Sequence, residues 1–409
     1  MKSSYQLRMF SCLVCLFICA TAYYPCTVAV VSGKVTADGR PLLWKNRDAS
    51  NPNNKLVFIQ GKIYSFLAVV NSTDSEGSHV WQGINSQGFA IMNSLSSDLG
   101  SGPQSYGENG SFMRRALEEC ADVMTFEKLL QASNGERRVA ANFGVIDAKG
   151  NACFFETGSE SFTKFDANDP RIAPQGYIVR TNYAFTAPED KQGGGYIRFE
   201  RISHLFQRAA AENRLNLKFI LQVASRDLVN EKIHSNPNTL LRVQDPSTPT
   251  YIRTNDTINR ISTVSVSVFH GAQSPDKAYT ATMWTMLGQP ICSVAVPLWV
   301  YAGTVPSVLG GEGNAPMNDL SKQMLAYLYP DQRANMKQYL NATRLLTYGG
   351  NGFLPRLFAI ENEIMESADI QIEAWYRKKP DPQVVAEYAK QTSDKATAAL
   401  KESFTDILD

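Results

Sequence analysis

Histidine and surplus charge are both scarce in this sequence. The chain has four histidines in 409 residues, and its 40 Lys and Arg residues are balanced by 39 Asp and Glu residues. A chain without excess charge offers no broad basic surface for nucleic acid. Beyond the first 22 residues, no His or Cys spacing is typical of a zinc site or a Cys/His protease. His270 is the best-placed histidine and is interpreted as structural, so the sequence implies no metal ion or other cofactor.

Cysteine is too rare for a disulfide framework. The sequence has seven cysteines, three of which lie in its first 22 residues. The four that follow are Cys26, Cys120, Cys153 and Cys292, which are too few to cross-link a chain of this length. A Cys120–Cys153 bridge stays open for an oxidising compartment, but buried free thiols are the simpler interpretation.

Long apolar runs are also missing beyond the N-terminus, so no membrane span is expected in the mature chain. The N-terminus itself carries Lys2 and Arg8, then an apolar run over residues 10–19, then the small-x-small sequence Ala20-Thr21-Ala22. This pattern is typical of a signal peptide over residues 1–22. We therefore expect an exported protein, periplasmic or secreted.

Cleavage of that signal after Ala22 would leave residues 23–25 in front of Cys26. Pro25 is unfavourable for a signal peptidase at the scissile position. Exposing Cys26 as the first residue therefore requires a second cut that removes 23–25 as a short propeptide. Two alternatives stay open: Cys26 is an ordinary strand residue, or it carries a lipid, although the residues before it lack the usual small and aliphatic types.

The stretch from Cys26 to Asp48 organises the chain. Two β-type runs, residues 27–32 and 42–48, flank a turn that contains Asp38-Gly39. This pattern predicts a β-hairpin. Because the second strand returns antiparallel to the first, we expect Asp48 to come back close to Cys26.

A cysteine that begins a mature chain carries its own base. The pKa of an α-amino group is about 7.7–8.0, so much of it is neutral near physiological pH. Asp48 would orient that amine and stabilise its protonated form. The thiolate would attack an amide carbonyl, a thioester would form as the amine leaves, and water would complete the cycle.

These features resemble the N-terminal-nucleophile (Ntn) amide hydrolases. The most similar groups are the choloylglycine hydrolase and penicillin V acylase family and the acyl-CoA:6-aminopenicillanic acid acyltransferase family. The resemblance rests on the Cys-Thr start and on Asn46 and Asp48, which match the Asn-x-Asp end of the family's second strand. The bile-salt branch usually has arginine three residues before that aspartate, where this chain has Lys45. A bile-acid conjugate is therefore not assumed as the substrate.

The resemblance implies three more site residues. The stretch 83–93 is similar to a Gly-x-Asn-x-x-Gly hairpin whose far end lies near the nucleophile, which points to Asn93, or to Ser94 because the spacing is shorter. Asn182, which ends an Arg-Thr-Asn sequence, is implied as the side-chain donor of an oxyanion hole. Arg260 matches an arginine that approaches the nucleophile from a late strand and supports it or binds a carboxylate. Arg47 is a weaker candidate for that role.

The order of β-type and helical stretches agrees with this resemblance. Helices are expected over residues 112–132, 196–211 and 217–230, between groups of short strands. The family fold is α+β, a four-layer αββα sandwich of two antiparallel sheets between helix layers. We expect this domain over residues 26–316 and a helical C-terminal region over 317–409, docked on the core or used for self-association.

The main hypothesis is an exported amidase that hydrolyses a linear C–N bond of a small N-acyl compound, with Cys26, Asp48, Asn182, Arg260 and Asn93 in its site. An acyltransferase is the first alternative, because it differs only in which nucleophile reaches the thioester. A non-catalytic cell-surface binding protein is the second. Its Cys26 would never be exposed as a free N-terminus.

Overall fold

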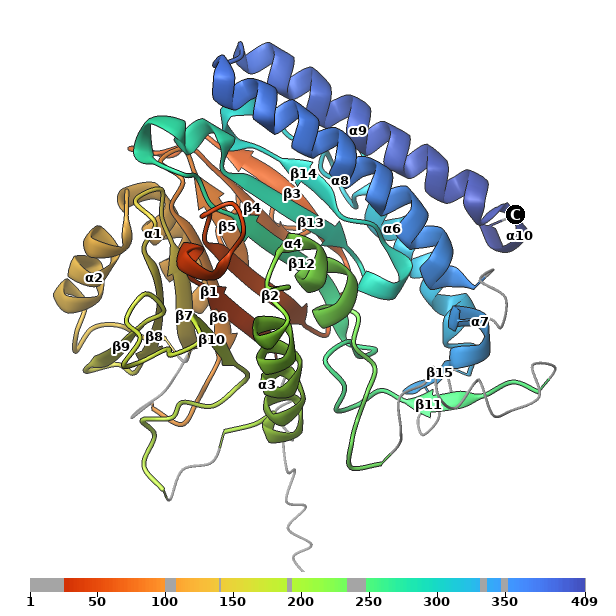
Figure 1. Cartoon of the computed structure of the whole chain (residues 1–409), viewed down its shortest axis with the longest axis horizontal. Helices are drawn as coiled ribbons and strands as arrows, with labels where there is room; N and C mark the ends of the chain where they lie inside the picture. The colour runs from red at the N-terminus through yellow and green to blue at the C-terminus, as the bar shows by residue number, and fades with distance from the viewer. Residues whose placement is uncertain are drawn as a thin grey trace, which may run out of the picture.

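Two antiparallel sheets packed face to face form the centre of the molecule (Figure 1). The computed structural model describes residues 26–99, 108–139, 141–189, 193–233, 248–331, 337–346 and 352–408. The expected signal peptide and propeptide lie outside the described residues.

The first sheet contains the predicted opening hairpin at its centre. Its six strands, in spatial order, are β10 (Tyr177–Arg180), β1 (Thr27–Val31), β2 (Leu42–Asp48), β12 (Thr263–His270), β13 (Thr282–Leu287) and β14 (Val296–Leu298). β1 and β2 pair antiparallel, with Thr27 opposite Asn46, which confirms the predicted hairpin. Every residue of these two strands is buried, because other layers cover both faces of the sheet.

The second sheet is a meander of seven strands in chain order. These strands are β3 (Asn54–Ile59), β4 (Phe66–Asn71), β5 (Gln82–Asn85), β6 (Ala90–Leu95), β7 (Ala141–Ile146), β8 (Ala152–Thr157) and β9 (Phe162–Asp166). Strands β6 and β7 lie against β1 and β2 of the first sheet. A separate two-stranded sheet joins β11 (Tyr251–Arg253) to β15 (Tyr339–Asn341).

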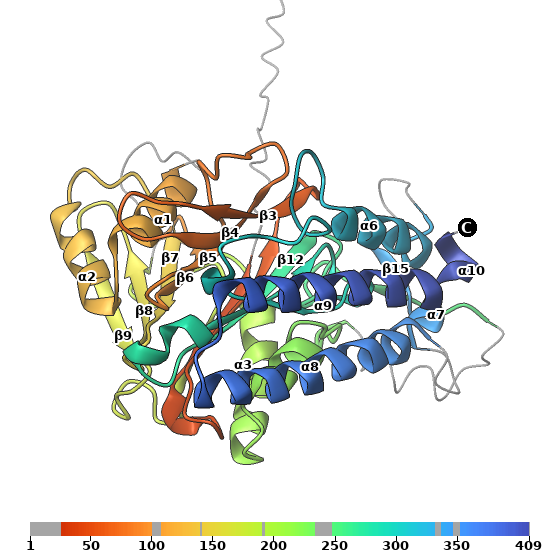
Figure 2. The ribbon, with the colours of Figure 1, turned by 90° about the horizontal axis from the view of Figure 1, so that it is seen from above.

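Helices cover the outer faces of both sheets (Figure 2). The α-helices are α1 (Glu108–Glu119), α2 (Val123–Ala132), α3 (Tyr196–Ala211), α4 (Leu217–Phe219), α6 (Pro316–Leu328), α7 (Ala342–Leu346), α8 (Phe353–Arg377), α9 (Pro382–Ser403) and α10 (Thr405–Leu408). The short 3₁₀-helices are η1 (Gly33–Val35), η3 (Pro275–Thr280), η4 (Pro290–Cys292) and η5 (Val300–Ala302), and η2 (Ile220–Ala224) is a π-helix.

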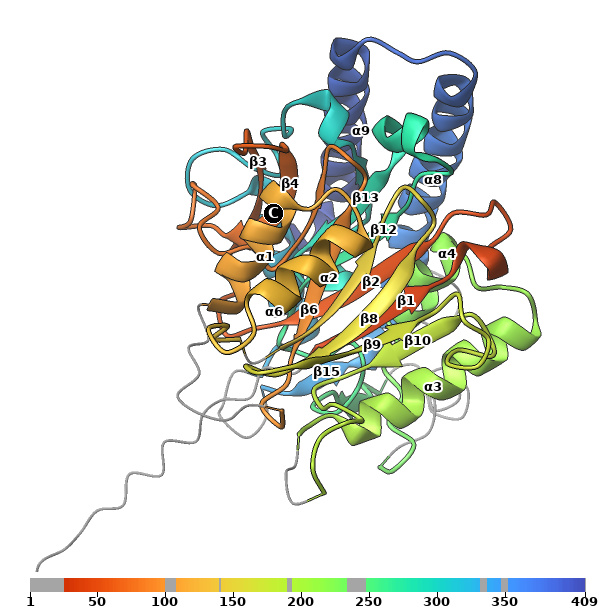
Figure 3. The ribbon, with the colours of Figure 1, turned by 90° about the vertical axis from the view of Figure 1, so that its left-hand side faces the viewer.

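The layer order is that of an αββα sandwich (Figure 3). Phe126 of α2 packs on Phe143 and Phe155 of the second sheet. On the other side, Phe206 of α3 stacks on Trp44 of β2, with ring centroids 6.1 Å apart. The expected α+β sandwich is therefore present, and the hairpin of β1 and β2 that follows Cys26 lies in its interior.

The C-terminal helices dock on the first sheet. Arg226 and Glu361 of α8 form an ion pair of 2.9 Å in which both side chains are buried. Glu361 also accepts a hydrogen bond from the main-chain N–H of Ala295, and Trp375 packs edge-on against Trp299. Within the described chain, no helix combines the length and the apolar character needed to cross a bilayer.

Two expected helices differ from the structure. The expected helix over 112–132 is two helices, because Asp122 caps α2 in a reciprocal capping box with Thr125. The expected helix over 217–230 ends at Ala224, after which the chain turns so that Arg226 enters the core. Strands β9, β11 and β15 were not expected from the sequence. They are short, and β9 carries exposed residues.

The cysteine interpretation is confirmed. Cys26, Cys120, Cys153 and Cys292 are all buried free thiols. Burial raises the pKa of Cys120 and of Cys153 to about 12, so neither thiol ionises near neutral pH. These two residues are therefore parts of the core rather than reactive groups.

Candidate active site

Cys26 lies immediately before β1 and is 6% exposed. The residues that follow fix its orientation, because side chains alternate along a strand. Val28 is paired with Lys45, whose side chain reaches Asn93 of β6 in the second sheet. Cys26 is two residues before Val28, so its side chain lies on the same face, between the two sheets.

Lys45 is a buried cation beside this position. Its Nζ donates to the carbonyl oxygen of Trp81 at 2.8 Å and to Oδ1 of Asn93 at 2.6 Å. Burial lowers the pKa of Lys45 to about 8, an effect that Cys26 and Asp48 oppose. A lysine with a pKa of about 8 therefore lies next to the candidate nucleophile.

Arg47 is a second buried cation on the same face. It donates to Oδ1 of Asn54 at 2.5 Å and to Oδ1 of Asn71 at 3.0 Å. Its guanidinium also lies over the Trp81 ring, 4.6 Å from the centroid. Burial lowers the pKa of Arg47 to about 10, and Cys26 opposes that shift. Lys45 and Arg47 together would stabilise negative charge that develops at the reacting centre.

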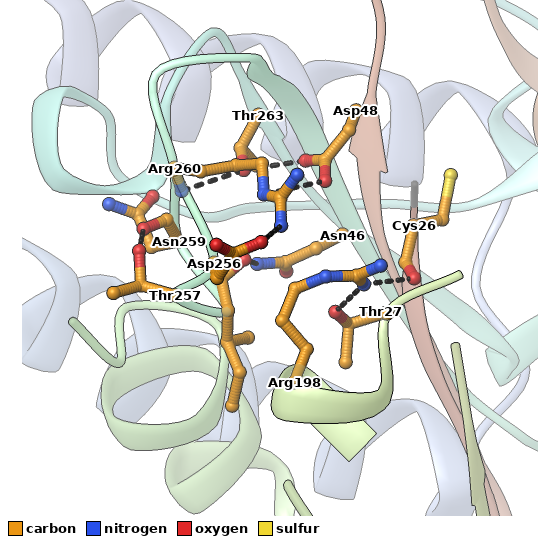
Figure 4. A network of polar contacts seen from close by, with 12 residues as sticks. Cys26, Thr27, Asn46, Asp48, Arg198, Asp256, Thr257, Asn259, Arg260 and Thr263 are labelled. Atoms are coloured by element: carbon orange, nitrogen blue, oxygen red, sulfur yellow. Dashed lines mark hydrogen bonds and ion pairs between the residues drawn. The ribbon is translucent and has the colours of Figure 1, made fainter. Parts of the chain in front are cut away.

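Asp48 ends β2 next to the start of β1 (Figure 4). Its Oδ1 accepts a hydrogen bond of 2.7 Å from Thr263, whereas its buried Oδ2 accepts none from the residues that the structure describes. Burial raises the pKa of Asp48, and Arg260 and Arg198 oppose that shift. One carboxylate oxygen is thus left available for a further donor.

Arg260 lies in the same network of polar contacts, and its guanidinium is directed toward Asp48. Its Nε is 3.5 Å from Oδ2 of Asp48, and its Nη2 is 3.8 Å from Oδ1 of Asp256. The side chain is largely buried between these two carboxylates. This geometry suits a residue that supports Asp48 better than one that meets a substrate carboxylate.

Asn182 is connected to Cys26 through a residue that sequence reasoning missed. Arg198, in the first turn of α3, donates to Oδ1 of Asn182 at 2.9 Å and to the carbonyl oxygen of Cys26 at 2.6 Å. Asn182 itself donates from Nδ2 to the carbonyl oxygen of Leu95 at 2.8 Å. The sequence signal ahead of Arg198 is the glycine run 193–195, which by itself indicates only a hinge before a helix.

Asn93 and its neighbour Ser94 both lie on β6 and are both buried. Asn93 accepts a hydrogen bond from Lys45 through its Oδ1, and its Nδ2 is the donor end of the amide. The hydroxyl of Ser94 has no hydrogen-bond partner among the described residues. The alternative between these two positions therefore stays open, with the link to Lys45 favouring Asn93.

His270 lies at the opposite end of the hairpin from Asp48. It is paired with Leu42, whereas Asp48 is paired with Thr263. Its Nε2 is 2.7 Å from Oδ2 of Asp38, and burial lowers its pKa to about 4. This position agrees with a structural role. Within the described ranges, no group of three or more His, Cys, Asp or Glu side chains is placed to hold a metal ion.

A buried cysteine that opens the central strand of an αββα sandwich is the arrangement expected of the Ntn class. The chain belongs to the acyl-coenzyme A:6-aminopenicillanic acid acyl-transferase family, whose sequence model matches residues 35–265, more than half of the chain. The protein thus falls among the Ntn-type amide hydrolases and acyltransferases. The matched residues include Asp48, Asn93, Asn182, Arg198 and Arg260, whereas Cys26 lies just before them.

Two solved structures have a weak likeness to the chain. A mutant of the conjugated bile acid hydrolase from Clostridium perfringens is 14% identical, with a TM-score of 0.40, and the alignment covers 64% of this chain and 89% of that one. Penicillin V acylase from Agrobacterium tumefaciens is 11% identical, with a TM-score of 0.35, covering 67% of this chain and 86% of that one. These likenesses are too low to support a statement about substrate or mechanism. No curated protein sequence matches the chain.

Proposed function

We propose that this protein is an exported cysteine amidase that hydrolyses the linear amide bond of an N-acyl compound. Removal of residues 1–25 would leave Cys26 as the first residue, with its α-amine as the base and its thiol as the nucleophile. The observation that carries the proposal is Oδ2 of Asp48, at the end of β2 beside the start of β1, which is buried, makes an ion-pair contact of 3.5 Å with Arg260 and accepts no hydrogen bond from the described chain. A buried carboxylate oxygen that accepts no hydrogen bond is unfavourable, and a freed α-ammonium group would supply one.

The remaining groups suit a thioester mechanism. The neutral α-amine takes the proton of the thiol, and the sulfur attacks the amide carbon. Side-chain N–H groups of Asn182 and Asn93 are the candidate donors to the resulting oxyanion, in a region made positive by Lys45 and Arg47. The α-ammonium then gives its proton to the departing amine, which leaves Cys26 acylated. Water, deprotonated by the same amine, hydrolyses the thioester.

Acyl transfer to an amine is the second candidate, because the family to which the chain belongs is defined by an acyl-transferase. The acyl-enzyme would be the same, and an acceptor amine would replace water in the second step. The two functions are separated by adding a primary amine to a reaction that releases acid. A transferase converts most of the acyl group to the new amide, whereas a hydrolase keeps releasing acid.

The first experiment is the intact mass and N-terminal sequence of the protein recovered from the exported fraction. The proposal expects a chain that begins at Cys26, with no added lipid mass, because only a free α-amine can serve as the base. A chain that begins at residue 23 and is nevertheless active on amides would contradict it. A lipidated Cys26 would favour the cell-surface binding protein instead.

A further inference from the structure

Arg198 is a fully buried arginine between the nucleophile candidate and the oxyanion candidate. It is 0% exposed and enters the site from the first turn of α3 (Figure 4). Its hydrogen bonds within the described chain all go to neutral oxygens: the carbonyl of Cys26 at 2.6 Å, Thr27 Oγ1 at 2.8 Å and Asn182 Oδ1 at 2.9 Å. A buried charge is expensive to desolvate, and the nearby charge of Asp48 opposes the effect of burial on the pKa of Arg198.

The first consequence concerns the amide of Asn182. A guanidinium only donates, so Oδ1 of Asn182 must face Arg198 and Nδ2 must face away from it. One N–H of Nδ2 is used by the carbonyl oxygen of Leu95, and the other is left to donate elsewhere. Arg198 thus decides which end of the amide is presented, and its charge polarises the amide toward stronger donation.

The second consequence concerns the nucleophile itself. The same guanidinium holds the carbonyl oxygen of Cys26 through Nη1 and the side chain of the next residue, Thr27. These bonds fix the main chain on which the Cys26 side chain and its nitrogen are carried. The guanidinium of Arg198 therefore fixes the nucleophile and the proposed oxyanion donor relative to each other.

The glycine run ahead of α3 makes room for this arrangement. Gly195 has φ +90°, and a Cβ built there would lie 2.2 Å from Nη2 of Arg198. A Cβ on Gly193 would lie 2.5 Å from the carbonyl oxygen of Asn182. Gly194 exchanges both main-chain hydrogen bonds with Asn182, at 3.1 and 2.9 Å. Larger residues would displace either the guanidinium or the strand end that carries Asn182.

We propose that Arg198 is a positioning residue that sets the amide of Asn182 as an oxyanion donor relative to Cys26. This proposal rests on the amidase function proposed above. It assigns Arg198 no contact with substrate, so its effect on catalysis should pass mainly through Asn182 and, for the rest, through the main chain of Cys26. That route can be tested because residues that act through one another are not additive.

The test is a double-mutant cycle on the mature protein, with kcat and KM measured on an amide substrate. Arg198→Met should lower kcat about 10²-fold with little change in KM, as expected when an oxyanion donor is misplaced. In an Asn182→Ala background the same change should cost at least about fivefold less, because only the bonds to Cys26 and Thr27 are then left to lose. Arg198→Lys keeps the charge but not the planar guanidinium with its several N–H donors, and it should recover part of the loss in kcat.

Arg201→Met is the matched control on the same helix. Arg201 pairs with Asp227 and Glu231, away from Cys26, so kcat should stay within about twofold. If Arg198→Met does not fold, Gly195→Ala replaces it, since that change moves the guanidinium without removing it. A loss in kcat of about tenfold is then expected, and it should again be smaller in the Asn182→Ala background.

The outcomes separate the two proposals. Equal losses from Arg198→Met in both backgrounds, or an unchanged kcat, would overturn the positioning role. The N-terminal mass of each variant shows whether activity is being compared on equally processed chains. If Cys26→Ala keeps its activity, it is the amidase mechanism that fails, whatever the cycle shows.

Discussion

The two ends of the opening hairpin each hold an aspartate beside an arginine, yet they are built in opposite ways. At the turn, Asp38 is 41% exposed and is paired with His270 at 2.7 Å. Burial raises its pKa, but bonding to His270 and the charge of Arg40 outweigh that effect and lower it to about 2. At the other end, burial raises the pKa of Asp48, and its Oδ2 accepts no hydrogen bond from the described residues. At the first end the carboxylate is bonded to its neighbours, whereas at the second Oδ2 of Asp48 has only the ion-pair contact of 3.5 Å with Arg260.

The contrast shows what distinguishes a functional cluster from a stabilising one. Both contain charges, so charge alone does not mark the site. The difference lies in unfulfilled hydrogen bonding under full burial, which a protein tolerates where function requires it. The predictions that follow test this difference, from the largest expected effect to the smallest.

The largest effect is expected from the nucleophile. Cys26→Ala should reduce amide turnover by at least about 10³-fold, because no other described group can form the thioester. The change should leave the thermal unfolding temperature nearly unaltered, since the side chain is small. Steady-state kinetics with a chromogenic amide measures the first effect, and calorimetry the second. Cys120→Ala is the control, because that thiol lies in the core of the second sheet, and it should leave turnover within about twofold.

The two aspartates provide the direct comparison. Asp48→Asn should lower kcat by about 10²–10⁴-fold, because the amide cannot stabilise the α-ammonium by charge. Asp38→Asn should leave kcat within about twofold and lower the free energy of unfolding by at most about 1 kcal/mol, because solvent screens the exposed carboxylate. Kinetics and chemical denaturation of both variants are needed. Equal losses of activity would mean that the two ends do not differ as described.

Lys45 predicts a pH dependence. Its pKa of about 8 means that its charge, and with it the orientation of Asn93, is lost as the pH rises through that value. The alkaline limb of the kcat profile should therefore begin near pH 8 and move upward in Lys45→Arg, which stays charged. Lys55→Arg is the control, since Lys55 is equally buried but bonds to Ser75 and Gly311. An alkaline limb at the same pH in Lys45→Arg would show that the titration of Lys45 does not cause the loss of kcat.

The same pKa has a consequence for stability with a fixed sign. A lysine titrates at about 10.4 in an unfolded chain, so between about pH 8 and 10.4 the unfolded state binds more protons than the folded one. The contribution of Lys45 therefore makes the folded state more stable as the pH rises through this window. Lys45→Met should remove that contribution, which denaturant titrations of both proteins across this pH range would measure.

Parts of the site could be predicted because they depend on short segments. The placement of Asp48 beside Cys26 follows from one turn and two alternating runs. The break between α1 and α2 also has a local signal, since Asp122 and Thr125 have capping-box spacing. Arg198 could not be found in this way. Its partners Cys26 and Thr27 are more than 170 residues earlier in the chain, and an arginine in an amphipathic helix normally faces solvent.

The sequence by itself determined the hairpin, the alternation that turns Cys26 toward the second sheet, and a chain of polar residues at strand ends. These are local properties, governed by a period of two and by turn chemistry. Only the tertiary structure decided that Arg260 pairs with Asp48, that Lys45 holds Asn93, and that Arg198 orients Asn182. These contacts join segments that are far apart in the sequence. They form only when the sheets and helices pack together, because a buried charge is stable only beside a suitable partner.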